Sequence, residues 1–98
     1  MLVCTTYFDN GLKISVSYSD IGKYIGYLRR EKNIKQKDLA REANLSRVAV
    51  SLIENGHCVP RAHTVASIAV AMGVTVAEIW EGCTKYTVEQ LGYKLVKN

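Results

Sequence analysis

Residues 36–56 constrain the fold of this chain most, because they combine two short helical patterns with the signals for a tight turn between them. Leu39 and Ala43 fall on one face of a first helix, and Val50 and Ile53 fall on one face of a second. The segment therefore predicts two helices that pack crosswise over a small contact.

The residues at the ends of these helices support the same interpretation. Ala40 is small enough to let the second helix approach, and Asn44 tolerates the left-handed backbone of a sharp turn. Ser46 can cap the second helix, and Gly56 can end it. Periodicity alone fits an ordinary antiparallel helix pair in a small bundle equally well.

The distribution of charge favours a nucleic-acid partner. The 98 residues include 13 Lys or Arg and 9 Asp or Glu, a formal net charge of +4, and the whole excess falls between residues 20 and 61. Phosphates would need to be neutralised there if the second helix entered a groove of DNA. A net charge of this size is also typical of a solvated basic face, so its position carries more weight than its magnitude.

Several different short motifs are spread over residues 20–82, nearly two thirds of the chain. Together they resemble the helix-turn-helix domains of phage Cro and repressor proteins and of the xenobiotic-response-element regulators. The resemblance implies a mainly α, five-helix lambda-repressor-like domain that binds double-stranded DNA. The motifs are Leu28-Arg29, Gln36-x-x-Leu39-Ala40, Leu45-Ser46-Arg47, Ile53-Glu54-Asn55-Gly56, Pro60, Ile68-Ala69 and Met72-Gly73-Val74.

The resemblance assigns the reading of DNA bases to Arg47, Val48, Ala49 and Leu52. The guanidinium fork of Arg47 matches the two acceptors of guanine, and the apolar Val48 and Leu52 suit a thymine methyl group. The alternatives are a phosphate contact or solvated surface for Arg47, and packing against a neighbouring element for Val48 and Leu52.

A second group of residues is implied to contact DNA phosphates. Gln36 would bind a phosphate and brace the second helix of the motif, while Lys35 and Arg61 would flank the groove or remain solvated surface charges. Both cations stand where the family usually has a capping residue. Without that cap, a helix loses about 1 kcal/mol of stability. The predicted phosphate group is Lys35, Gln36, Ser46, Ser51, Asn55 and Arg61.

Arg29 and Glu54 match a family pair that ties the first helix to the end of the third. The resemblance implies a largely buried, structural salt bridge. Losing one partner would then cost roughly 3–5 kcal/mol, because the other charge would be left uncompensated.

The remaining helices are predicted from periodicity and caps. Trp80, at the end of the last one, is interpreted as a lid on the core, and Thr75-Val76-Ala77-Glu78 as a capping box. The expected helices cover residues 20–32, 36–43, 47–54, 62–72 and 76–80, the first capped by Ser19 or Asp20.

Both ends of the chain are expected to extend a single domain spanning residues 1–98, with a hairpin at 2–18, a helical core at 20–82 and an extension at 83–98. A two-residue turn at Asn10-Gly11 would pair Tyr7 with Ile14, Thr5 with Val16 and Val3 with Tyr18. A one-turn cap at 87–90 and a short strand at 93–96 would follow the helices, and the β segments are expected to serve a dimer. The alternative is a sheet that enlarges the core of a monomer.

No metal, cofactor or catalytic constellation stands out. Cys4, Cys58 and Cys83 are an odd number without paired spacing, and His57, Cys58 and His63 lack zinc-type spacing. We therefore expect no cofactor, no metal and no enzymatic activity. The lack of a signal or membrane-spanning pattern predicts a cytoplasmic protein of the bacterial or phage nucleoid.

These observations lead to the prediction of a homodimeric, sequence-specific transcriptional repressor that reads the major groove with residues 47–54. The alternative is an antitoxin-type module whose β extensions bind a partner protein. A third interpretation is a helix-turn-helix module used for protein contacts alone.

Overall fold

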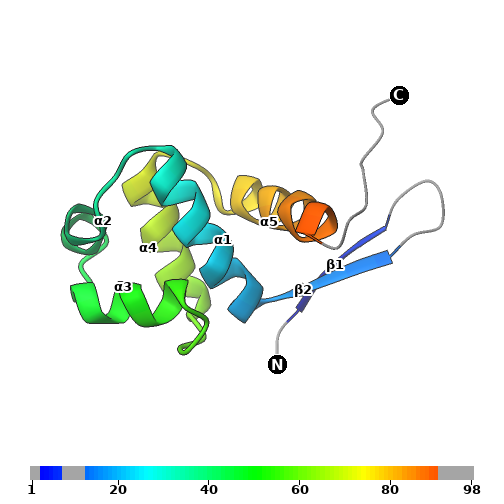
Figure 1. Cartoon of the computed structure of the whole chain (residues 1–98), viewed down its shortest axis with the longest axis horizontal. Coiled ribbons are helices and arrows are strands. Elements are labelled where there is room, and N and C mark those ends of the chain that lie inside the picture. The colour runs from blue at the N-terminus through cyan, green and yellow to red at the C-terminus, as the bar shows by residue number, and fades with distance from the viewer. Residues whose placement is uncertain (1–2, 8–12, 91–98) are drawn as a thin grey trace.

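The computed structural model describes the backbone of residues 3–7 and 13–90, and the side chains of residues 20–88. Five helices form the body of the molecule, which confirms the predicted mainly α fold (Figure 1). Two strands precede them in the chain. In order, the elements are β1 (Val3–Tyr7), β2 (Lys13–Ser17), α1 (Tyr18–Glu31), α2 (Gln36–Glu42), α3 (Arg47–Glu54), α4 (Ala62–Met72) and α5 (Val76–Gln90).

The core draws apolar side chains from all five helices. Helix α1 lies in the middle, with α3 and α4 on one side and α5 on the other (Figure 1). No helix can bury its apolar face alone, so the five fold as one unit. Side chains that are at most 1% exposed include Ile21, Ile25, Leu39, Val50, Val65, Ile68 and Ile79.

The turn between α2 and α3 follows the local chemistry of its residues. Asn44 adopts a left-handed φ of 57°, and the Ala49 amide donates a 3.0 Å hydrogen bond to Ser46 Oγ. Gly56, with a φ of 77°, follows the end of α3. The predicted turn, N-cap and helix stop are therefore present, and α3 has the predicted bounds.

Helix α3 approaches α1 closely because α1 has glycines at the crossing. A Cβ atom added at Gly22 would collide with the carbonyl oxygen of Ile53, and one added at Gly26 would lie 3.1 Å from Glu54 Cβ. The two glycines allow the carboxyl end of α3 to rest directly on α1.

Helix α5 is longer than predicted. The expected end at Trp80 and the separate cap at 87–90 are both wrong, because the helix continues to Gln90. Its apolar face continues as well, with Cys83 and Val88 fully buried. Gly82 lies inside the helix, at the crossing with α1, where a Cβ atom would collide with the Tyr24 hydroxyl.

The start of α5 has the amide-to-hydroxyl bond of the predicted capping box. The Glu78 amide donates a 3.0 Å hydrogen bond to Thr75 Oγ1, and Trp80 packs against the core as a half-buried side chain. The strand predicted at 93–96 lies outside the described residues.

Strands β1 and β2 pair antiparallel, but in a register that differs from the predicted one. Tyr7 pairs with Lys13 and Thr5 pairs with Ser15, so each predicted pair is wrong by one residue. The connection between Tyr7 and Lys13 has an odd number of residues, whereas a two-residue turn flanked by paired positions requires an even number.

No single helix in the described ranges is long and apolar enough to cross a bilayer. The segments Ala62–Met72 and Val76–Val88 meet the length and composition test only together, across a 95° bend. Their buried apolar residues, which include Val65, Ile68 and Ile79, belong to the core.

Candidate nucleic-acid interface

The first turns of α3 present a mixed polar and apolar face to solvent. Arg47 and Val48 are exposed there, and Leu52 lies one turn further along. The side chains of Val50 and Ile53 point the other way, into the core. The helix therefore has one side fixed by packing and one side free for a ligand.

A shallow groove runs along this exposed side, with a volume of about 230 Å³. It brings together the amino end of α2 and the outer face of α3. Five residues that the sequence assigned to DNA contacts meet in it: Gln36, Arg47, Val48, Ser51 and Leu52.

A second, strongly basic groove of about 370 Å³ adjoins the first and shares Gln36 and Arg47 with it. Within the described part of the chain, Lys35, Lys37 and Arg47 form no ion pair, so their charges remain available to an anion. Cations gathered along a concave surface raise the local concentration of anionic ligands. The groove is lined by Arg29, Lys35, Gln36, Lys37 and Arg47.

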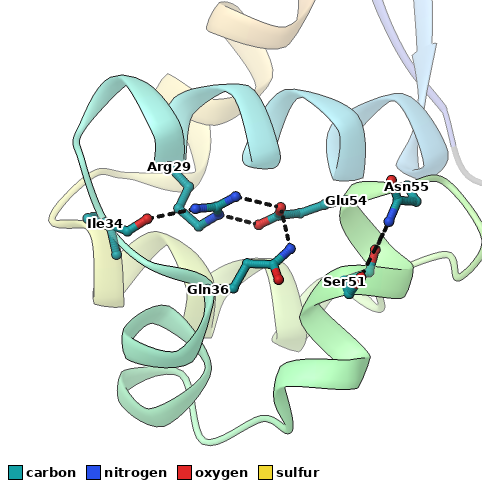
Figure 2. Close-up of polar contacts among 6 residues, drawn as sticks. All are labelled: Arg29, Ile34, Gln36, Ser51, Glu54 and Asn55. Atoms are coloured by element: carbon teal, nitrogen blue, oxygen red, sulfur yellow. Dashed lines mark hydrogen bonds and ion pairs between the residues drawn. The ribbon is translucent and has the colours of Figure 1, made fainter.

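A buried ion pair joins α1 to the end of α3, and one of its partners, Arg29, lines the basic groove (Figure 2). Arg29 Nε donates to Glu54 Oε2 at 2.7 Å and Arg29 Nη2 donates to Glu54 Oε1 at 3.0 Å, a bidentate arrangement. The two side chains are 11% and 4% exposed. Arg29 Nη1 also donates to the carbonyl oxygen of Ile34 at 2.7 Å, so one guanidinium joins α1, the loop before α2, and α3.

Gln36 is held by the same carboxylate. Its Nε2 donates to Glu54 Oε1 at 3.0 Å, which connects the amino end of α2 to the end of α3 (Figure 2). Since Gln36 also lines both grooves, this bond sets the position of a groove residue. The Arg29, Glu54 and Gln36 side chains thus fix α2 and α3 relative to each other.

The other three residues of the predicted phosphate group, Ser46, Asn55 and Arg61, do not line either groove. Asn55 Nδ2 donates to the Ser51 carbonyl at 2.8 Å, which folds the amide back over the end of α3 (Figure 2). Ser46 Oγ is occupied as the helix cap. Arg61 is exposed at the start of α4, where it makes no side-chain cap, and Ala49 is half-buried outside both grooves.

Lys37 is a groove residue that the sequence reasoning missed. It immediately follows Gln36 in the first turn of α2 and is exposed. Its position next to Lys35 and Gln36, at the amino end of α2, could have indicated that it lies in the groove.

The side chains that could bind a metal ion do not form a cluster. Among the described residues, no group of three or more His, Cys, Asp or Glu side chains lies close enough to hold a metal ion. Cys58 is an exposed free thiol and Cys83 a buried one.

A sequence model of the helix-turn-helix family matches residues 25–79, from the middle of α1 to the first turn of α5. That match spans more than half of the chain. The chain belongs to the Cro/C1-type helix-turn-helix family. The α2–α3 pair is its helix-turn-helix unit. No curated protein sequence matches the chain significantly.

Solved structures with a similar fold include a gene regulator and two restriction-modification controller proteins. The clp gene regulator ClgR from Corynebacterium glutamicum is 21% identical, with a TM-score of 0.70, over 76% of this chain and 80% of that one. The wild-type restriction-modification controller protein C.Esp1396I is 26% identical, with a TM-score of 0.67, over 74% and 94%. The controller protein C.AhdI from Aeromonas hydrophila is 24% identical, with a TM-score of 0.60, over 63% and 94%.

Proposed function

We propose that this helix-turn-helix protein is a transcriptional regulator that binds double-stranded DNA in a sequence-specific manner through α3. The observation that carries the proposal is the pair of adjoining grooves, one mixed and one basic, that share Gln36 and Arg47. The similarity to a restriction-modification controller protein at 26% identity supports the same function. The proposed function requires binding alone and no catalytic step.

In the proposed complex, the amino-terminal half of α3 enters the major groove. Arg47 then donates two hydrogen bonds to the O6 and N7 acceptors of a guanine. Val48 and Leu52 contact apolar edges of neighbouring bases, and Ala49 allows the helix backbone to come close to the DNA. A bidentate contact of this kind discriminates against a wrong base by about 1–3 kcal/mol.

Phosphate contacts would hold α3 in register. The cations of the basic groove, Lys35 and Lys37, face one DNA strand beside Gln36. Ser46, Ser51, Asn55 and Arg61 are proposed to contact the backbone at the ends of α3 and the start of α4. Each phosphate neutralised by a cation adds about 0.9 to the slope of log affinity against log salt concentration.

We further propose that the protein acts as a homodimeric repressor. One short helix reads only a few base pairs, and two copies related by a two-fold axis would read a palindrome with half-sites about 34 Å apart. A dimer bound across a promoter would exclude the transcription machinery. Strand β2 already packs against α5 and α1 of the same chain, so the proposal of a dimer rests on the short reach of one reader helix and not on the hairpin.

The test is selection from a pool of random duplex DNA, followed by sequencing of the retained fraction. Arg47→Ala is compared with Arg41→Ala, a matched control whose guanidinium is exposed on α2 and pairs with Asp38. We expect wild type and Arg41→Ala to enrich the same palindrome, and Arg47→Ala to lose the preference at one position of each half-site. Binding that is abolished by moderate salt and enriches no motif would contradict the proposal.

A further inference from the structure

Two exposed apolar side chains on α3 are not explained by contacts to guanine or phosphate. Val48 is 69% exposed and Leu52 is 42% exposed. They are four residues apart, so they stand one above the other on the outer face of the helix. Both line the groove that also contains Arg47, whereas the apolar residues that build the core point the opposite way.

The floor of the major groove offers little that such side chains can bind. All four base pairs present hydrogen-bond donors or acceptors there, and the C5-methyl group of thymine is the apolar feature. A 5-methylcytosine presents the same methyl group at the same ring position. The polar residues Gln36, Arg47 and Ser51 line the same groove as the two apolar side chains. Such a mixture suits a methyl group on DNA, whose other groups are polar or anionic.

The helix geometry sets the spacing of the methyl groups. Four residues of an α-helix advance by about 6 Å. Successive base pairs of DNA are about 3.4 Å apart. Val48 and Leu52 therefore match methyl groups that lie one or two base pairs apart in the same half-site.

We infer that α3 is a reader of C5-methylated pyrimidines: Val48 and Leu52 each bind the methyl group itself. Binding then depends on the C5 substituent, so a methylated pyrimidine is preferred to its unmethylated form, thymine to uracil and 5-methylcytosine to cytosine. The inference rests on the proposed function and adds to it the chemical group that is recognised. It also makes operator affinity sensitive to cytosine C5 methylation.

The test uses the duplex selected by the wild-type protein. Uracil replaces each thymine of a half-site in turn, which removes one methyl group and leaves the base pair otherwise unchanged. We expect two positions, one or two base pairs apart, at which the dissociation constant rises about fourfold each, and about 15-fold together. At the same positions, 5-methylcytosine should bind more tightly than cytosine by a similar factor.

Variants connect each methyl group to a side chain. In Val48→Ala the effect of uracil should vanish at one position, and in Leu52→Ala at the other. Val70→Ala, which shortens an 80% exposed valine on α4, is the matched control and should keep both effects.

Two results would overturn the inference. If specific binding persists and uracil changes affinity at no position, or changes it equally in Val48→Ala and Leu52→Ala, the methyl groups are not bound by these residues, while the proposed function stands. If no duplex is bound specifically, the proposed function and the inference both fail.

Discussion

Removing one partner of the Arg29–Glu54 ion pair should cost more stability than breaking any other polar contact between described side chains. In Glu54→Gln the size of the side chain is kept and the charge is lost. The Arg29 guanidinium, which is only 11% exposed, then lacks its counter-charge. The Gln36 amide loses a charged acceptor at the same time. Removing one partner of a buried pair costs about 3–5 kcal/mol of unfolding free energy.

Urea denaturation followed by circular dichroism measures this loss. With a typical slope of about 1–3 kcal/mol per molar urea for a small domain, the midpoint should fall by at least about 1 M. The thermal midpoint should fall by at least about 12 °C, since each kcal/mol shifts a domain of this size by roughly 4–8 °C. The matched control is Asp38→Asn, which breaks the exposed pair with Arg41 and should cost less than about 1 kcal/mol.

A double variant separates the charge effect from the packing effect. Arg29→Met combined with Glu54→Met removes both charges and keeps apolar volume, so it should cost less than the sum of the two single changes. The reasoning is refuted if Glu54→Gln costs less than about 1 kcal/mol, or if the double variant costs the full sum of the single ones.

Three further changes follow from local geometry. Gly22→Ala should cost about 1–3 kcal/mol in thermal unfolding, because the new methyl group forces α1 away from the Ile53 carbonyl; an unchanged midpoint would refute the close crossing. Ser46→Ala removes the cap from the Ala49 amide and should cost about 1 kcal/mol in urea unfolding, with no loss as the contrary result. Lys35→Ser supplies the missing cap of α2 and should stabilise the fold by about 1 kcal/mol while lowering the salt slope of DNA binding by about 0.9; an unchanged slope would exclude a phosphate contact by Lys35.

The parts of the fold that the sequence predicted correctly depend on local chemistry. Asn44, Ser46 and Gly56 each act within a few residues of their own position, so turn, cap and stop could be deduced from residue type. The register of β1 and β2 could not, because Asn10-Gly11 is compatible with more than one turn length. The length of α5 could not be predicted either, because the role of Gly82 depends on a tertiary contact. Its missing side chain leaves room for Tyr24 of α1.

The site divides in the same way. The positions of Arg47, Val48 and Leu52 on the outer face of α3 follow from helical periodicity. The presence of Lys37 in the basic groove, and the bond from Arg29 to the Ile34 carbonyl, depend on how α1, α2 and α3 meet. Such contacts between elements leave no periodic signal in a single sequence.

The central claim is that α3 lies in the major groove with Arg47 on a guanine. Dimethyl sulfate methylates guanine N7, which faces the major groove, so footprinting the selected duplex tests the claim directly. We expect wild type and Arg41→Ala to protect one guanine in each half-site, and Arg47→Ala to leave that guanine reactive at protein concentrations that still occupy the duplex. Equal protection with Arg47→Ala, or reactive guanines throughout the wild-type complex, would contradict the account.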